Sequence, residues 1–200
     1  VRPCKGVPCT LTSEEMHRPS GAPFAGGYLI QSLGTMPLAY AGKLARGLNV
    51  SGAELRQRMR LYNHTAGITI IGDCLPREQN RLTLSHEKDA LGLPKPHVYF
   101  EYGRNEQQLN DHAEKLLRRI WSAAGARDMW AYPRNKHALG TCRMGADSAD
   151  SIVDHRCRAF DVPNLTICDG SVFPSALAAN PTLTIMALAE RAADIFLQER

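Results

Sequence analysis

His137 and Asn180 are the two side chains of this sequence whose types and settings favour chemistry. His137 opens the pattern His-x-x-Gly-Thr-x-x-Met-Gly, whose glycines allow the backbone to turn tightly beside a ligand. Since an imidazole titrates near neutral pH, His137 is suited to take a proton from a substrate hydroxyl. Asn180 precedes an apolar stretch, where its amide either caps the following helix or holds a substrate oxygen. Taken singly, both residues also fit structural roles, so the case for catalysis depends on the motifs around them.

The residues after Asn180 predict a helix whose N-terminus suits an electron-rich or anionic ligand. Pro181 fits the first turn of that helix, because a first-turn N–H has no intrahelical partner and its absence costs nothing. The other first-turn N–H groups and the positive end of the helix dipole lie beside Thr182. The helix predicted over 182–200 is almost wholly apolar in its first half, so we expect other protein to cover most of it.

Strands and shorter helices are predicted upstream of these motifs. Apolar and β-branched runs bounded by turn residues predict strands at 66–72, 80–85, 97–102 and 164–168. The alternation in the second of these runs is typical of a half-buried strand. Helices are predicted at 37–47, after the capping-box sequence Ser51–Glu54, and between Asn105 as N-cap and Gly125 as C-cap.

The composition is that of an ordinary globular protein. Hydrophobic residues make up 44% and charged residues 22% of the 200 residues, with a formal net charge of +4. The strongest basic concentration, at Lys115, Arg118 and Arg119, lies on one face of a predicted helix and is typical of a solvated surface. A nucleic-acid partner is therefore not expected. No run approaches the roughly 20 apolar residues that cross a bilayer.

Six cysteines stand at positions 4, 9, 74, 142, 157 and 168. Cys4 and Cys9 resemble half of a metal knuckle, but no second close pair of ligands completes a usual zinc spacing, so no metal site is predicted. Reduced thiols are one interpretation and a Cys4–Cys9 disulfide is another. Cysteine usage leans towards a reducing compartment, and we expect a cytoplasmic or membrane-associated protein.

The order of the short motifs along the chain carries a resemblance to a known family. They are Gly-Thr-Cys-Arg-Met-Gly (140–145), Ile-Val-Asp (152–154), Val-Pro-Asn-Leu (162–165), Asp-Gly-Ser-Val-Phe-Pro (169–174), Asn-Pro-Thr-Leu-Thr (180–184) and Ala-Glu-Arg-Ala-Ala (189–193). Together they resemble the C-terminal region of the glucose-methanol-choline (GMC) oxidoreductases. The likeness is specific across 137–198, looser over 66–125 and weakest in 1–65, where 26–31 looks like a substrate-domain strand.

The resemblance implies a mixed α/β (α+β) fold in two parts. Residues 1–125 would form much of an antiparallel substrate-binding sheet with helices. Residues 126–200 would return the chain to a Rossmann-like FAD-binding domain, adding a strand and the last helix. The reaction implied is oxidation of a CH–OH group in a small alcohol, sugar or choline-like substrate, by hydride transfer to flavin N5.

The same resemblance implies roles for five residues. His137 would be the base, and Asn180 would stand at the family's second position, which holds histidine or asparagine. Asp169 and Gly170 match the turn beside the FAD diphosphate and ribityl chain, whereas Asn180, Pro181 and Thr182 match the turn that meets the pyrimidine edge of the isoalloxazine. The electron acceptor stays open among oxygen, a quinone and a cytochrome partner.

One departure from the family pattern is large. The dinucleotide fingerprint Gly-x-Gly-x-x-Gly is absent from the sequence. Because the sequence also starts without methionine, we expect a C-terminal fragment, inactive alone, whose partner is the N-terminal FAD-binding part of the same protein. A separate polypeptide supplying the nucleotide site is the alternative. A non-catalytic structural or interaction domain that kept the fold without flavin is a competing hypothesis of a different class.

Overall fold

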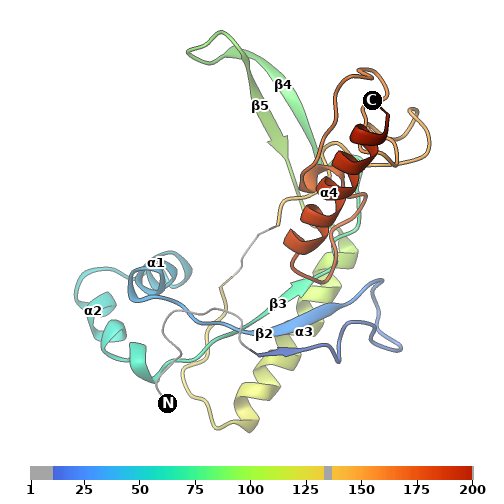
Figure 1. Cartoon of the computed structure of the whole chain (residues 1–200). Helices are drawn as coiled ribbons and strands as arrows, with labels where there is room; N and C mark the ends of the chain where they lie inside the picture. The colour runs from blue at the N-terminus through green and yellow to red at the C-terminus, as the bar shows by residue number, and fades with distance from the viewer. Residues whose placement is uncertain (1–10, 133–136, 200) are drawn as a thin grey trace. The chain divides into compact units, whose positions relative to one another are not determined.

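A computed structural model describes residues 11–132 and 137–199 (Figure 1). Cys4 and Cys9 lie outside the described residues. The chain divides into two compact units, the first made of Val1–Gly72 and Gln108–Asn135 and the second of Asp73–Gln107 and Lys136–Arg200. Among the described helices, none combines the length and apolar character needed to span a membrane.

An antiparallel three-stranded sheet forms the centre of the first unit. Its strands β1 (Thr12–Ser13), β2 (Tyr28–Ser32) and β3 (Ile68–Gly72) lie in the order β1-β2-β3. The fully buried Tyr28 of β2 joins Leu109 of helix α3 (Arg104–Ala123) in one hydrophobic cluster. The strands predicted at 26–31 and 66–72 are thus confirmed, and period-two alternation places their apolar side chains against the helix.

Two short helices complete this unit. Helix α1 (Pro37–Gly47) has the predicted bounds, and helix α2 (Gly52–Arg60) begins directly after Ser51, followed by the 3-10 turn η1 (Tyr62–His64). The side chain of Ser51 makes no capping hydrogen bond. The sequence signature therefore locates the start of α2 correctly, but the capping box itself is not formed.

The two ends of α3 show how local sequence sets helix boundaries. At the C-terminus Gly125, at φ +72°, and Ala126 donate their N–H groups to the carbonyls of Ser122 and Trp121. This is the Schellman arrangement, and the prediction of Gly125 as C-cap is confirmed. Asn105 as N-cap was wrong, because the helix begins at Arg104 and Asn105 lies inside it.

The second unit contains an exposed hairpin. Strands β4 (Arg81–Lys88) and β5 (Pro94–Tyr99) pair antiparallel, with an irregularity between Leu84 and Lys88. The predicted half-burial was wrong: Leu84 is 68% and Val98 66% exposed. In a two-stranded ribbon each strand has one neighbour, and no described layer covers its faces, so alternation here does not produce a buried side. Because one edge of β5 has no neighbouring strand in this hairpin, the strand can contain Pro94 and Pro96, which lack an N–H to donate. β5 therefore begins earlier than the predicted 97–102.

The rest of the second unit has little regular structure before its last helix. It contains the 3-10 turn η2 (Gly170–Val172) and helix α4 (Thr182–Gln198) around a core of Val153, Ala159, Val172 and Phe173. The strand predicted at 164–168 was wrong, because only Thr166 pairs, through one antiparallel bridge to Arg158. A strand needs a partner along its length, and the described residues supply just this bridge.

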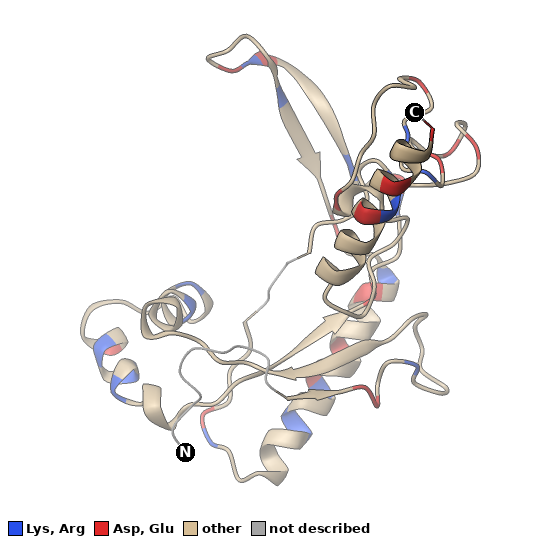
Figure 2. Cartoon of the chain, in the orientation of Figure 1, with Lys and Arg blue, Asp and Glu red and all other residues tan. Residues whose placement is uncertain are grey.

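Helix α4 exposes much of its apolar surface. Leu183 is 79%, Met186 63% and Leu197 65% exposed. In Figure 2 the first turns of α4 are tan, because the sequence from Thr182 to Ala189 contains no Lys, Arg, Asp or Glu. Other protein normally covers a helix with so much apolar surface. The described residues cover only part of α4, so the predicted burial of this helix is incomplete.

Candidate active site

The segment that begins at His137 runs alongside the turn η2. The N–H groups of Gly140, Cys142 and Met144 donate to the carbonyls of Gly170, Ser171 and Val172, over 3.1, 2.9 and 2.8 Å. These three bonds are the pairing that fixes the two motifs to each other. Nothing in the local sequence of either motif encodes this pairing.

Gly170 is the point where three motifs meet. A Cβ atom on Gly170 would lie 2.7 Å from Cδ2 of Leu139 and 3.3 Å from Cδ1 of Ile185. Leu139 belongs to the His137 segment and Ile185 to the second turn of α4, and both also pack on the buried core around Val172. The absence of a side chain at Gly170 therefore allows the His137 segment and α4 to approach the turn closely.

His137 has an unusual backbone conformation. Its φ is +60°, in the left-handed region that non-glycine residues seldom occupy, and its side chain is exposed. Such a conformation costs of order 1–3 kcal/mol and is found disproportionately at functional sites. Three residues later, Gly140 is also left-handed, at φ +80°, and a Cβ there would lie 2.9 Å from the carbonyl oxygen of Phe173.

Asp169 closes the turn on the other side of the pairing. Its Oδ1 accepts a hydrogen bond of 2.7 Å from the N–H of Ser171, as the cap of η2. Hydrogen bonds from the side chain and the backbone of Ser171 lower the pKa of Asp169. The carboxylate therefore stays ionised at neutral pH and fixes the backbone of the turn.

Asn180, Pro181 and Thr182 lie at the start of α4. Asn180 is not the N-cap, which corrects the capping interpretation: the cap position falls on Pro181, whose side chain makes no capping bond. Pro181 is buried and its carbonyl accepts from the N–H of Ile185 over 2.9 Å, whereas Asn180 and Thr182 are exposed. The helix start thus offers N–H groups without a side-chain cap, and this donor set fits the electron-rich edge of a flavin.

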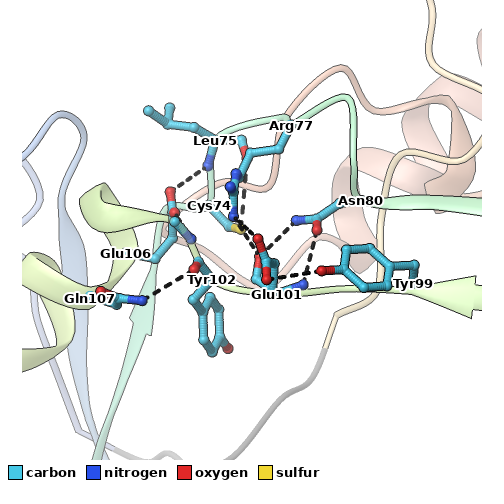
Figure 3. A network of polar contacts seen from close by, with 10 residues as sticks. Cys74, Leu75, Arg77, Asn80, Tyr99, Glu101, Tyr102, Glu106 and Gln107 are labelled. Carbon is cyan, nitrogen blue, oxygen red and sulfur yellow. Dashed lines mark hydrogen bonds and ion pairs between the residues drawn. The ribbon is translucent and has the colours of Figure 1, made fainter.

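A buried carboxylate, Glu106, was missed by sequence reasoning. Glu106 is 3% exposed and accepts a hydrogen bond from the backbone N–H of Gly103. It accepts another from the backbone N–H of Leu75 (Figure 3). Next to Leu75, Cys74 exchanges two backbone hydrogen bonds with Ala176, in the loop before Asn180. One signal was available: glutamate three residues after a helix-start glycine is the second half of a capping box.

A cavity of about 80 Å³ lies elsewhere, beside the C-terminal half of α4, where Arg156, Arg158 and Ile195 contribute to its wall. Both arginines form ion pairs with Glu199. At 1.5 Å per helical residue Ile195 is roughly 20 Å along the helix from Asn180. This cavity is therefore separate from the predicted catalytic residues.

The structure thus joins the His137 segment, the Asp169–Gly170 turn and the start of α4 around one core within the second unit. Its described residues show no hydrogen bond that links the side chains of His137 and Asn180. Their convergence on a common substrate oxygen stays a prediction.

Comparison with known proteins gives a family for this chain. Residues 76–189 match the C-terminal family model described as GMC oxidoreductase. The fructose dehydrogenase large subunit of Gluconobacter japonicus is 34% identical, over 80% of this chain and 30% of that protein. The 2-methyl-1,2-propanediol dehydrogenase of Mycolicibacterium austroafricanum is 38% identical, over 64% of this chain and 24% of that protein.

The fold is also found in a solved structure. The crystal structure of pyridoxine 4-oxidase from Mesorbium loti superposes with a TM-score of 0.54 at 17% identity, covering 86% of this chain and 35% of that chain. The chain thus spans between about a quarter and a third of the length of these three proteins. Since the family model covers more than half of the sequence, the chain belongs to the GMC oxidoreductase family.

Proposed function

We propose that this chain supplies the catalytic base and its amide partner to an FAD-dependent enzyme. The enzyme oxidises a CH–OH group of a small alcohol, sugar or choline-like substrate, with His137 as base and Asn180 as partner. The observation that carries the proposal is the junction at Gly170, where Leu139 of the His137 segment and Ile185 of α4 meet. It brings both predicted catalytic segments to one turn.

Five residues of this chain would hold FAD: Asp169, Gly170, Asn180, Pro181 and Thr182. The uncapped start of α4 supplies N–H donors and the positive end of a helix dipole, which together stabilise an electron-rich ring edge. When bound, FAD supplies the acceptor for the hydride at N5. The sequence contains no nucleotide fingerprint. In this proposal, a preceding FAD-binding part of the same protein would supply the rest of the FAD site.

His137 takes the proton of the substrate hydroxyl. Its imidazole is exposed, and the segment that it begins is fixed to the turn by the bond from Gly140 to Gly170. Asn180 donates its amide N–H to the substrate oxygen and so stabilises the charge that develops as the proton leaves. An exposed amide with no capping duty is available for that bond.

The substrate class follows from the named relatives and stays broad. One relative is named for a sugar and another for a diol, so we place sugars and small polyols first and choline-like alcohols after them. The exposed apolar face of α4, which includes Leu183, Met186 and Leu197, would contact the preceding FAD-binding part. Oxygen, a quinone or a cytochrome partner would each reoxidise the flavin without changing these residues.

The test is anaerobic mixing of the flavin-loaded full-length protein with separate sugars, diols, linear alcohols and choline. Bleaching of the flavin absorbance by at least one hydroxyl compound, followed by turnover with a dye acceptor, is the expected result. Readmitting oxygen in place of the dye separates an oxidase from a dehydrogenase. A protein that binds no flavin, or whose flavin none of these compounds reduces, would support the non-catalytic alternative instead.

A further inference from the structure

We infer that Glu106, in the first turn of α3, is a positioning residue for the loop that carries Asn180. The inference rests on the proposed function, because it gives the position of this loop a role in the reaction. It depends on a chain of backbone hydrogen bonds within the second unit that joins the carboxylate to Ala176.

The first step of this chain is a bond that helix capping does not explain. Glu106 accepts from the N–H of Gly103 over 2.9 Å. This is the usual capping-box bond between a glutamate at the third helical position and the N-cap residue before the helix. Its other oxygen accepts from the N–H of Leu75 over 3.1 Å, across 31 residues of sequence, and from the side-chain amide of Asn105 over 3.2 Å. The carboxylate therefore fastens the segment at Leu75 to the start of α3.

The second step leads from that segment to the Asn180 loop. Cys74 donates its N–H to the carbonyl of Ala176 over 3.2 Å and accepts from the N–H of Ala176 over 3.3 Å. Between Pro174 and Asn180, the described backbone hydrogen bonds are these two. Asn180 follows Ala176 by four residues, so the segment held by Glu106 anchors the loop that leads to Asn180.

The charge of Glu106 strengthens the first step. Burial raises the pKa of this carboxyl group, but hydrogen bonds from Leu75, Asn105 and Gly103 outweigh that effect and the net pKa is lowered. The group is therefore ionised at neutral pH, and hydrogen bonds to an ionised acceptor are roughly twice as strong as neutral ones. A glutamine at this position would keep the size of the side chain but lose the charge and one acceptor oxygen.

Glu101 provides a matched control in the same network (Figure 3). Its carboxylate accepts from the hydroxyl of Tyr99 over 3.0 Å and pairs with Arg77 over 3.3 Å. These bonds hold the base of the hairpin, and the side chain is 52% exposed. Glu101→Gln makes the same chemical change as Glu106→Gln without removing an acceptor from Leu75.

The test compares these two variants in the flavin-loaded full-length protein. Amide hydrogen exchange at Cys74 and Ala176, whose N–H groups form the two bonds between the segments, reports the anchoring of the loop independently of activity. Rapid-mixing flavin reduction reports its consequence. Glu106→Gln is expected to speed exchange and to slow flavin reduction by about tenfold each, the effect of losing one charge-assisted bond. Glu101→Gln is expected to match the parent in both. Where Glu106→Gln does not fold, Glu106→Asp retracts the carboxylate by one methylene and is measured in the same way.

Asn180→Ala then separates the inference from the proposed function. If Glu106 acts through Asn180, Glu106→Gln costs no further flavin-reduction rate in the Asn180→Ala background. Parent-like exchange in Glu106→Gln, or an equal slowing of flavin reduction in both backgrounds, overturns the inference. Parent-like flavin reduction in Asn180→Ala overturns the proposed role of Asn180, whereas the exchange of the Cys74 and Ala176 amides still reports whether Glu106 holds the loop.

Discussion

Replacing Gly140 by alanine should disturb the pairing of the His137 segment with the Asp169–Gly170 turn. The same substitution at Gly125 is the matched control. Gly140 has φ +80°, and a Cβ atom there would lie 2.9 Å from the backbone carbonyl oxygen of Phe173. Gly125 has a similar φ of +72°, but a Cβ there would meet nothing within 4 Å. Alanine at both positions pays the cost of the left-handed conformation, and only Gly140→Ala adds a collision with backbone.

The magnitudes follow from these contacts. A left-handed alanine costs about 1–2 kcal/mol, partly offset by the lower entropy of the unfolded chain, so Gly125→Ala should lose about 1 kcal/mol. The collision at Gly140 adds the roughly 1–3 kcal/mol typical of overpacking, because Phe173 Cα and its carbonyl are fixed by the buried core. Gly140→Ala should therefore lose about 2–4 kcal/mol of unfolding free energy.

Urea denaturation followed by tryptophan fluorescence measures both losses in the full-length protein. The expected result is a larger fall in midpoint for Gly140→Ala than for Gly125→Ala, with an unchanged slope. Equal losses would refute the reasoning, because they would mean that Gly140 is needed for its φ alone and that the approach to Phe173 is not tight.

Three further outcomes follow from individual contacts. Tyr28→Phe should lose about 1 kcal/mol, because the buried Tyr28 hydroxyl bonds Nδ1 of His112 over 2.9 Å; an unchanged melting temperature would contradict this. The lowered pKa of Glu106 contributes stability that is present above its ordinary pKa of 4.5 and lost as pH falls through the folded-state value. The melting temperature of Glu106→Gln should therefore fall less on acidification than that of the parent, and parallel pH curves would be inconsistent with a lowered pKa of Glu106. Asn180→Ala should leave the melting temperature nearly unchanged, because its side chain caps no helix; a loss of about 1 kcal/mol would restore the capping role.

The parts of the fold that were predictable from sequence are those set by local chemistry. Gly125 was recognised as a helix end because a glycine after an amphipathic run favours the left-handed cap that the Schellman bonds require. Helix α1 and strand β3 were likewise recognisable from their own residues. Helix boundaries were less predictable. Asn105 resembles an N-cap, yet the helix begins at Arg104, two residues earlier than that cap implies, where Glu106 accepts from the N–H groups of Gly103 and Leu75.

The predictions that were wrong concern elements whose structure depends on partners distant in the sequence. The run at 164–168 has the composition of a strand, but only its pairing with Arg158 exists among the described residues. The β4 alternation predicts a buried face only if something packs on it. For the site, the motif order predicts the candidate residues. The backbone hydrogen bonds from Gly140 to Gly170 and between Cys74 and Ala176 join segments 30 and 102 residues apart (170 − 140; 176 − 74), which no local pattern encodes.

The role of His137 is the claim on which this account depends most. In the flavin-loaded full-length protein, His137→Ala should slow flavin reduction by roughly 10²–10⁴-fold, the contribution of a positioned acid–base group. Bound flavin should be retained, because the proposed contacts of this chain with FAD come mainly from the turn at 169–170 and the start of α4. Rapid mixing of oxidised enzyme with substrate gives the rate, and Asn180→Ala should be slowed less. If His137→Ala reduces its flavin at the parent rate while Asn180→Ala is inactive, His137 is not the base.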